Sequence, residues 1–310
     1  MSEGGEESEA VGTTCACCGI AEIDDIKLVP CDGCDLVRYC GDGCKDNHKS
    51  EHEEECKKRA AELHDELLFK QPESSCFGDC PICCLPMPID EKKSITSECC
   101  SKVICFGCAL ANAMRLREGR LVPSCLFCRE PWLSKSDEGT KKRILKRVKA
   151  NDPVALCHEG MMQRSKGHNT RAFEYFTKAA KLGNAEAHKH LANMYNGGYS
   201  IEKDTRKRIY HLEEAAIGGH PACRHNLGAY EWNSGNKERA VKHYIIAATH
   251  GQDESIKVLM DEFRKGHVSK DDLASALRAH KAAVDATKSP QRDKAEECYR
   301  NSRYCRSSRC

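Results

Sequence analysis

Residues 15–56 read CACCGIAEIDDIKLVPCDGCDLVRYCGDGCKDNHKSEHEEEC, and cysteines recur through this stretch in closely spaced pairs. Two cysteines with two residues between them can both reach one ion at about 2.3 Å, so each pair supplies half of a tetrahedral zinc site. The candidate ligands are Cys15, Cys18, Cys31, Cys34, Cys40, Cys44, His52 and Cys56. This spacing predicts a finger that two zinc ions hold together.

A second cysteine cluster follows over residues 80–128, with the same kind of pairing. Its candidate ligands are Cys80, Cys83, Cys99, Cys100, Cys105, Cys108, Cys125 and Cys128. Two clusters of this size predict four zinc ions in all. The fold class that we expect is two small zinc-stapled fingers of irregular α+β structure, followed by an all-α helical-repeat solenoid.

Disulfide bonds are the alternative explanation for so many cysteines, but they require a secreted chain. The first nine residues, MSEGGEESE, are acidic and contain no apolar segment, which is unlike a signal peptide. No uncharged apolar run approaches the roughly 18 residues of a membrane span. We therefore expect a soluble zinc protein of the cytoplasm or nucleus, with no membrane partner.

Composition agrees with a soluble, helix-rich protein of two or three domains. The chain has 310 residues, of which 31% are charged, and its formal net charge is +2. A charge so near zero argues against a general binder of nucleic acid. Basic residues nevertheless gather in residues 141–149 and in the tail after Ser289.

The pattern along the chain predicts seven segments. These are a disordered acidic N-terminus at 1–11, the first finger at 12–57, a helical linker at 58–75, the second finger at 76–133, a basic helix at 134–150, helical repeats at 151–289 and a disordered basic tail at 290–310.

The repeats are visible in paired alanines that recur at intervals of 36 and 32 residues. The three copies are Lys178-Ala-Ala-Lys-Leu-Gly-Asn, Glu214-Ala-Ala-Ile-Gly-Gly-His and Ile246-Ala-Ala-Thr-His-Gly-Gln. An apolar residue precedes each pair, namely Phe176, Leu212 and Tyr244. A period in the mid-thirties with two amphipathic helices predicts a solenoid. Paired alanines would let neighbouring helices approach closely, and the glycine after them would end each helix.

This region resembles the Sel-1-like repeats, which are related to tetratricopeptide repeats. The matching elements include Leu191, Tyr195, Gly198, Asp204, and the run Asn226-Leu227-Gly228. The chain departs from the pattern at Glu159, where the family has leucine, and at Arg208, where it has alanine. The resemblance implies a scaffold that binds other proteins.

The first cluster resembles a MYND finger, in its spacing and in Gly19 and Tyr39 beside the ligands. In that family the pairs interleave, which implies one zinc on Cys15, Cys18, Cys40 and Cys44 and another on Cys31, Cys34, His52 and Cys56. Cys17 and His48 compete with Cys18 and His52. The family's peptide groove uses a tryptophan and a glutamine that residues 45–51 lack.

The second cluster resembles a RING finger, with Cys80-Pro-Ile-Cys83 at its start and Cys125-Leu-Phe-Cys128 at its end. The RING cross-brace implies one zinc on Cys80, Cys83, Cys105 and Cys108 and another on Cys99, Cys100, Cys125 and Cys128. Lys102 stands where the family has a histidine, so the resemblance is to the all-cysteine variants. Adjacent ligands at Cys99 and Cys100 are unusually tight, and Cys76 and Cys84 are the possible substitutes. Lys102 and Arg129 could offset the negative charge of the thiolates.

The resemblance to RING fingers implies a ubiquitin ligase that acts by positioning a charged conjugating enzyme, without a covalent intermediate. By that resemblance, Ile82 and Leu126 contact the conjugating enzyme and Arg129 contacts ubiquitin, while the solenoid holds the protein substrate. The alternative is a non-catalytic interaction scaffold with two structural zinc fingers. The sequence identifies neither the conjugating enzyme nor the substrate.

Overall fold

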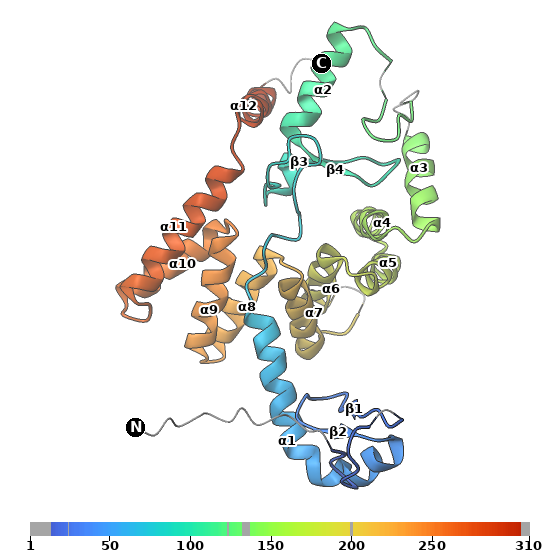
Figure 1. Ribbon diagram of the computed structural model, residues 1–310. Helices are drawn as coiled ribbons and strands as arrows, with labels where there is room; N and C mark the ends of the chain where they lie inside the picture. Colours follow the sequence, from blue (N-terminus) through green and yellow to red (C-terminus); the bar gives the residue numbers. More distant parts are fainter. Residues whose placement is uncertain (1–13, 24, 123, 132–136, 199–200, 305–310) are drawn as a thin grey trace. The chain divides into compact units, whose positions relative to one another are not determined.

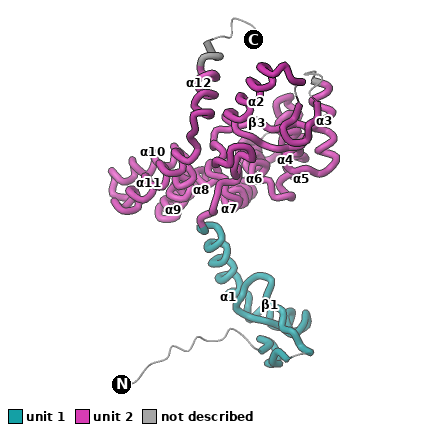
Figure 2. Tube along the Cα trace, turned by 45° about the horizontal axis from the view of Figure 1, so that its top comes forward, with its two compact units in different colours: residues 1–70 teal, residues 71–310 magenta. Residues whose placement is uncertain are grey.

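The computed structural model describes residues 14–23, 25–122, 124–131, 137–198 and 201–304. The chain divides into two compact units, residues 1–70 and residues 71–310 (Figure 2). The first unit contains the first finger and the second contains the second finger together with the solenoid. The expected disordered segment 1–11 lies outside the described residues.

The first finger has little regular structure before its helix. Strands β1 (Val29–Pro30) and β2 (Arg38–Tyr39) pair antiparallel, and α1 (Asp42–Phe69) follows. Its small core consists of Cys15, Leu28 and Tyr39, which are buried. A core of this size cannot stabilise a fold by burial alone, so bound metal must supply the rest.

Helix α1 includes most of the segment that the sequence predicts to be a separate helical linker. The helix begins inside the first finger and runs without a break to Phe69, so residues 58–69 are not a separate element. The chain leaves the helix at Lys70, immediately before Gln71 and Pro72, because proline cannot continue a helix. The first finger and the helical part of the linker therefore form one unit.

The second finger is a hairpin followed by a helix. It contains a short 3₁₀ turn η1 (Glu91–Lys93), the antiparallel strands β3 (Ser94–Thr96) and β4 (Val103–Cys105), and helix α2 (Phe106–Glu118). Met87 and Ile104 are buried with Cys80, Cys105 and Cys108 in its core. The thiol groups thus make up much of the interior.

A basic helix, the helical repeats and one further helix follow (Figure 1). The helices are α3 (Asp137–Lys149), α4 (Pro153–Ser165), α5 (Asn169–Lys181), α6 (Ala185–Gly197), α7 (Thr205–Ile217), α8 (Pro221–Asn233), α9 (Lys237–Thr249), α10 (Asp253–Arg264), α11 (Lys270–Ala286) and α12 (Pro290–Tyr304). Each helix from α4 to α9 packs on the next along the chain, which confirms the solenoid. No helix in these residues combines the length and apolar character that crossing a bilayer requires.

The repeated residues form the solenoid core, as the period predicts. The paired alanines are buried in all three copies, and so are Phe176, Leu212 and Tyr244. Gly183, Gly219 and Gly251 end their helices with φ between 81° and 88°, a region where a side chain is strained.

Gly228, part of the Sel-1-like match, has a different purpose. A Cβ atom there would lie 2.8 Å from the Tyr244 ring, so the glycine lets α9 pack closely on α8. Gly160 stands in the same relation to Phe176, at 2.6 Å. The motif is therefore explained by contact between helices.

The expectation of a disordered tail over residues 290–310 is wrong for residues 290–304. These residues form α12, which packs against α2 of the second finger (Figure 1). The composition is polar, but Ala295 is buried and Arg292 reaches into the finger. Contacts with a distant part of the chain order the segment, and composition carries no information about them. Residues 305–310 lie outside the described part of the chain.

Candidate metal centres

In the first finger the predicted ligands come together in two groups. Cys15, Cys18, Cys40 and Cys44 form one group, and Cys31, Cys34, His52 and Cys56 form the other; the ligand atoms within each group lie within 4.8 Å of one another. The groups interleave along the chain, so each site joins an early loop to later residues. The two sites thereby fix the strands and α1 to each other.

Helix α1 supplies Cys44, His52 and Cys56. Residues four apart on a helix lie on the same face, so this face of α1 points to both sites. Cys34 Sγ lies 3.1 Å from His52 Nε2, and Cys31 Sγ lies 3.7 Å from Cys56 Sγ.

The second finger also brings its eight predicted ligands together as two interleaved groups. Cys80, Cys83, Cys105 and Cys108 form one, while Cys99, Cys100, Cys125 and Cys128 form the other. Cys105 ends β4 and Cys108 lies in the first turn of α2, so the strand and the helix both hold the first group.

Three C-x₂-C pairs each lie in the same kind of backbone turn, which we call a knuckle. In a knuckle, the N–H of the first residue donates to the carbonyl five residues later, and the residue four positions on has positive φ. The knuckles are residues 15–20, 80–85 and 125–130, with N···O distances of 2.7, 2.9 and 3.0 Å and positive φ at Gly19, Cys84 and Arg129. The turn directs both thiols of a C-x₂-C pair to the same point.

The knuckles also favour the thiolate form of the first cysteine. Burial by itself raises the pKa of these thiols, but surrounding backbone N–H groups outweigh it. They lower the pKa to about 6 at Cys15 and at Cys80, and to about 7 at Cys125. Thiolate is the form that binds metal.

A fourth knuckle explains how adjacent cysteines can share a site. In residues 97–102 the N–H of Ser97 donates to the carbonyl of Lys102 at 2.8 Å, and Ser101 has a φ of 58°. Ser97 occupies the first ligand position of this knuckle and Cys100 the second. Cys99, within the turn, replaces the missing first ligand, and its Sγ lies 3.2 Å from Cys128 Sγ.

The competing candidates lie outside the four groups. Cys17 is exposed, and Cys84 is exposed at the positive-φ position of its knuckle. The amide of Cys76 donates to the carbonyl of Gly219 in the solenoid, at 3.1 Å. His48 Nδ1 lies 3.2 Å from the Tyr39 hydroxyl.

The donor sets fit zinc. Two sulfurs on one tetrahedral zinc lie about 3.8 Å apart, given bonds of about 2.3 Å. The sulfur–sulfur distances are 3.6 Å for Cys18 and Cys40, 3.9 Å for Cys83 and Cys105, and 3.7 Å for Cys100 and Cys125. Three groups offer four thiols and one offers three thiols and an imidazole, which are the usual structural zinc sets. Zinc in them would hold the fingers folded.

The sequence offered no sign of one charged residue at these sites. Arg292 Nη2 lies 3.4 Å from Cys83 Sγ, although the two residues are 209 positions apart. The expected counter-charges are placed differently. Lys102 and Arg129 are exposed, and no contact found among the described residues joins either charged group to a cysteine sulfur.

The candidate contacts for a conjugating enzyme are on the surface of the second finger. Ile82 is 43% exposed and Leu126 is 37% exposed, each within a knuckle. Arg129 is the positive-φ residue of the second of these knuckles and is exposed.

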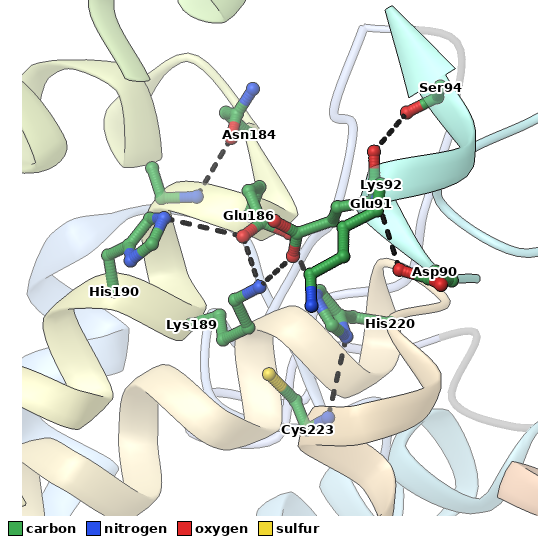
Figure 3. A network of polar contacts seen from close by, with 11 residues as sticks. Asp90, Glu91, Lys92, Ser94, Asn184, Glu186, Lys189, His190, His220 and Cys223 are labelled. Atoms are coloured by element: carbon green, nitrogen blue, oxygen red, sulfur yellow. Dashed lines mark hydrogen bonds and ion pairs between the residues drawn. The ribbon is translucent and has the colours of Figure 1, made fainter. Parts of the chain in front are cut away.

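A polar network joins the second finger to the solenoid (Figure 3). Lys189 of α6 binds Glu91 of the finger at 2.5 Å and also pairs with Glu186. His220 Nε2 lies 3.1 Å from Glu186 Oε2, while its Nδ1 accepts from the amide of Cys223 at 3.4 Å. Burial alone would raise the pKa of Glu186, but His220 and Lys189 lower it to about 2. The carboxylate is therefore charged and paired at neutral pH.

The finger contacts the solenoid at further points beside this network. The ring of Phe77 meets that of His220 edge-on, with centroids 5.5 Å apart. Arg143 of α3 binds Glu98 at 3.0 Å. These contacts fix the position of the finger on the repeats.

Comparisons with known proteins support the first finger. Residues 15–56 match the family model of the MYND finger. Comparison with curated proteins gave no match.

Among solved structures, the chain is similar to a Sel1 repeat protein from Oxalobacter formigenes, with 23% identity and a TM-score of 0.43 over 58% of this chain and 73% of that one. It is also similar to c5321, described as a protective antigen of uropathogenic Escherichia coli strains with an SLR fold. That match has 18% identity and a TM-score of 0.38, over 57% of this chain and 38% of that one. The solenoid is seen directly in the packing of α4 to α9 described above. The chain is thus a zinc-binding protein with a MYND finger, a second cysteine finger and a helical-repeat solenoid.

Proposed function

We propose that the protein is a zinc-dependent interaction adaptor whose second finger acts as a RING-type ubiquitin ligase module. In this proposal the second finger holds a ubiquitin-charged conjugating enzyme, and the solenoid holds the protein substrate. We further propose that it works in the cytoplasm or the nucleus, because the reduced thiols that the four sites need persist in those compartments.

The observation that carries the proposal is the second finger itself. Two interleaved cysteine groups hold a hairpin and a helix. The knuckle of residues 80–85 presents the exposed side chain of Ile82, and that of residues 125–130 presents Leu126. Exposed aliphatic residues on a rigid turn suit the docking of another protein, because little order is lost on binding.

The contact between finger and solenoid supports the adaptor role. The pairs Glu91–Lys189 and Glu98–Arg143 connect the two parts (Figure 3 shows the first). A protein bound to the repeats would therefore keep a constant position relative to the finger. Transfer of ubiquitin by positioning needs such a fixed geometry.

One observation favours a second candidate, the non-catalytic scaffold. Helix α12 packs on α2, and Arg292 binds the carbonyls of Leu85 and Pro86, at the end of the knuckle that presents Ile82. This packing reduces the surface of the finger that a conjugating enzyme could use. The two candidates differ in one measurable activity.

That activity is discharge of ubiquitin from a charged conjugating enzyme, measured with the full-length zinc-loaded protein and a panel of conjugating enzymes. Ile82→Ala should abolish stimulation while the protein keeps four zinc ions. Ile95→Ala is the matched control, because Ile95 is 42% exposed in the same finger but lies on β3. Arg129→Asn should slow discharge while leaving conjugating-enzyme binding intact. Asparagine is the replacement of choice because it tolerates the positive φ at this position, so the knuckle keeps its shape.

Failure of the wild-type protein to stimulate any enzyme of the panel would favour the scaffold. Loss of activity in Ile95→Ala but not in Ile82→Ala would move the docking surface to the hairpin.

A further inference from the structure

The guanidinium group of Arg292 joins α12 to the second finger through several hydrogen bonds. Its Nη1 donates to the carbonyl of Pro86 at 2.7 Å and to that of Thr287 at 2.8 Å. Its Nη2 donates to the carbonyl of Leu85 at 3.2 Å and lies 3.4 Å from the sulfur of Cys83. One side chain thus holds the knuckle of residues 80–85 and a ligand thiol.

The finger is shaped to receive this residue. A Cβ atom at Gly107 would lie 3.0 Å from the Cα of Arg292, so only glycine allows α2 to come this close. The neighbouring Gln291 has its Oε1 4.0 Å from the sulfur of Cys108, a second ligand of the same group. Arginine and glutamine of α12 therefore both face the group of Cys80, Cys83, Cys105 and Cys108.

Charge gives this contact its strength. Four thiolates on one zinc ion leave about two negative charges, and arginine keeps its positive charge at all physiological pH values. N–H groups that donate to a ligand sulfur orient the ligand and stabilise its anionic form. Arg292 is partly buried, so solvent screens the interaction only in part.

The other contacts of α12 are weaker. Lys93 and Glu296 form an ion pair at 3.2 Å, but both side chains are more than 40% exposed, and such pairs contribute little. The rings of Tyr299 and Phe106 meet edge-on with their centroids 6.3 Å apart. Ala295 is buried, but its side chain is a single methyl group. Docking of α12 therefore depends largely on Arg292, whose partners in the finger are the carbonyls of Leu85 and Pro86 and the sulfur of Cys83.

We propose that Arg292 is the outer-shell partner of the zinc site formed by Cys80, Cys83, Cys105 and Cys108, and that metal binding and docking of α12 stabilise each other. Coupling between two binding events is reciprocal. Zinc holds the helix on the finger, and the helix raises the affinity of the finger for zinc. The second finger is consequently completed by a segment that lies beyond the solenoid. This inference holds whether or not the finger is a ligase.

The test is zinc transfer from the full-length protein to a chromogenic chelator, with metal content followed by native mass spectrometry. Arg292→Gln should bind one of its four zinc ions 10- to 100-fold more weakly, the usual cost of losing an outer-shell partner. Arg292→Lys keeps the positive charge but loses the two-pronged guanidinium group. Its zinc affinity should lie between those of the wild type and Arg292→Gln. Arg300→Gln is the control, because Arg300 is on the same helix and, among the residues that the structure describes, its guanidinium group pairs with Glu296 at 3.6 Å and not with the finger.

Two further readouts separate a metal-site role from a purely structural one. Alkylation of thiols during transfer should label Cys80, Cys83, Cys105 and Cys108 first in Arg292→Gln. Hydrogen exchange should show that residues 290–300 lose protection when zinc leaves the wild-type protein. Zinc affinity unchanged in Arg292→Gln would overturn the proposal, as would α12 remaining protected after zinc has left.

Discussion

His48 and His52 stand one turn apart on α1, and the sequence offers either of them as a ligand. Their surroundings differ. His52 is 4% exposed and its Nε2 faces Cys34, whereas His48 bonds to the hydroxyl of Tyr39. The two rings stack with their centroids 5.8 Å apart, so His48 packs beside the site without entering it.

We therefore expect opposite results from the two glutamine variants. His52→Gln removes a nitrogen ligand and should lower the zinc content from four ions to three. His48→Gln should keep four ions and lose about 1 kcal/mol of stability, the usual value of one hydrogen bond. Native mass spectrometry measures the content. Three ions in His48→Gln together with four in His52→Gln would assign the ligand to His48.

At the scale of elements, the α6–α7 pair contains two histidines in contact. His188 Nε2 lies 3.2 Å from the carbonyl of Ala180, so it donates there, and its Nδ1 accepts from Nδ1 of His211 at 3.0 Å. Tyr195 and Tyr210 lie against the ring of His211. Burial lowers the pKa of both histidines, to about 4 for His211, although the hydrogen bond to Ala180 and the charge of Glu214 partly raise that of His188.

These lowered pKa values predict that the solenoid loses stability in mild acid. The unfolded chain gains protons on these residues below about pH 6.5, while His211 in the folded chain stays neutral until about pH 4 and the pKa of His188 is lowered as well. Stability therefore falls through this window, by about 1.4 kcal/mol per pH unit for one such histidine. The free energy of unfolding, measured with urea at pH 7, 6 and 5.5, should fall less steeply with decreasing pH in His211→Gln than in the wild type. Equal slopes for the two proteins would contradict the assignment.

The elements differ in how far the sequence could predict them. The knuckles were predictable because ligands such as Cys15 and Cys18 are close in sequence, and the turn between them has few solutions. The burial of Phe176 and of the paired alanines followed from the helical period. The binding of Cys99 and Cys100 in one site was harder to predict, because it depends on the positive φ of Ser101.

The position of α12 could not be predicted for a different reason. Its contacts with the finger join residues about 200 positions apart, and its own sequence has no apolar stripe. One arginine orders it, through carbonyls and a thiol that are recognisable only in the folded chain.

At the scale of the whole molecule, the first finger and the solenoid depend on metal to different degrees. The first finger has three buried core residues and two metal sites, and α1 carries ligands of both sites. The solenoid instead buries large side chains such as Phe176, Leu191 and Leu259 in clusters that contain no candidate zinc ligand. Apolar packing is insensitive to chelation, whereas the folding free energy of a structural zinc site is its binding free energy.

Removal of zinc should therefore unfold one part of the chain and leave another folded. With excess chelator at neutral pH, hydrogen exchange measured by mass spectrometry should show that residues 14–56 lose their protection, including the ligand-bearing half of α1. Helices α5 to α9 should keep theirs, because their buried residues contact one another. Zinc added back should restore protection in residues 14–56, which controls for irreversible oxidation of the thiols. Loss of protection in α5 to α9 together with the metal would mean that the fingers hold the solenoid folded, and the division of the chain by source of stability would be wrong.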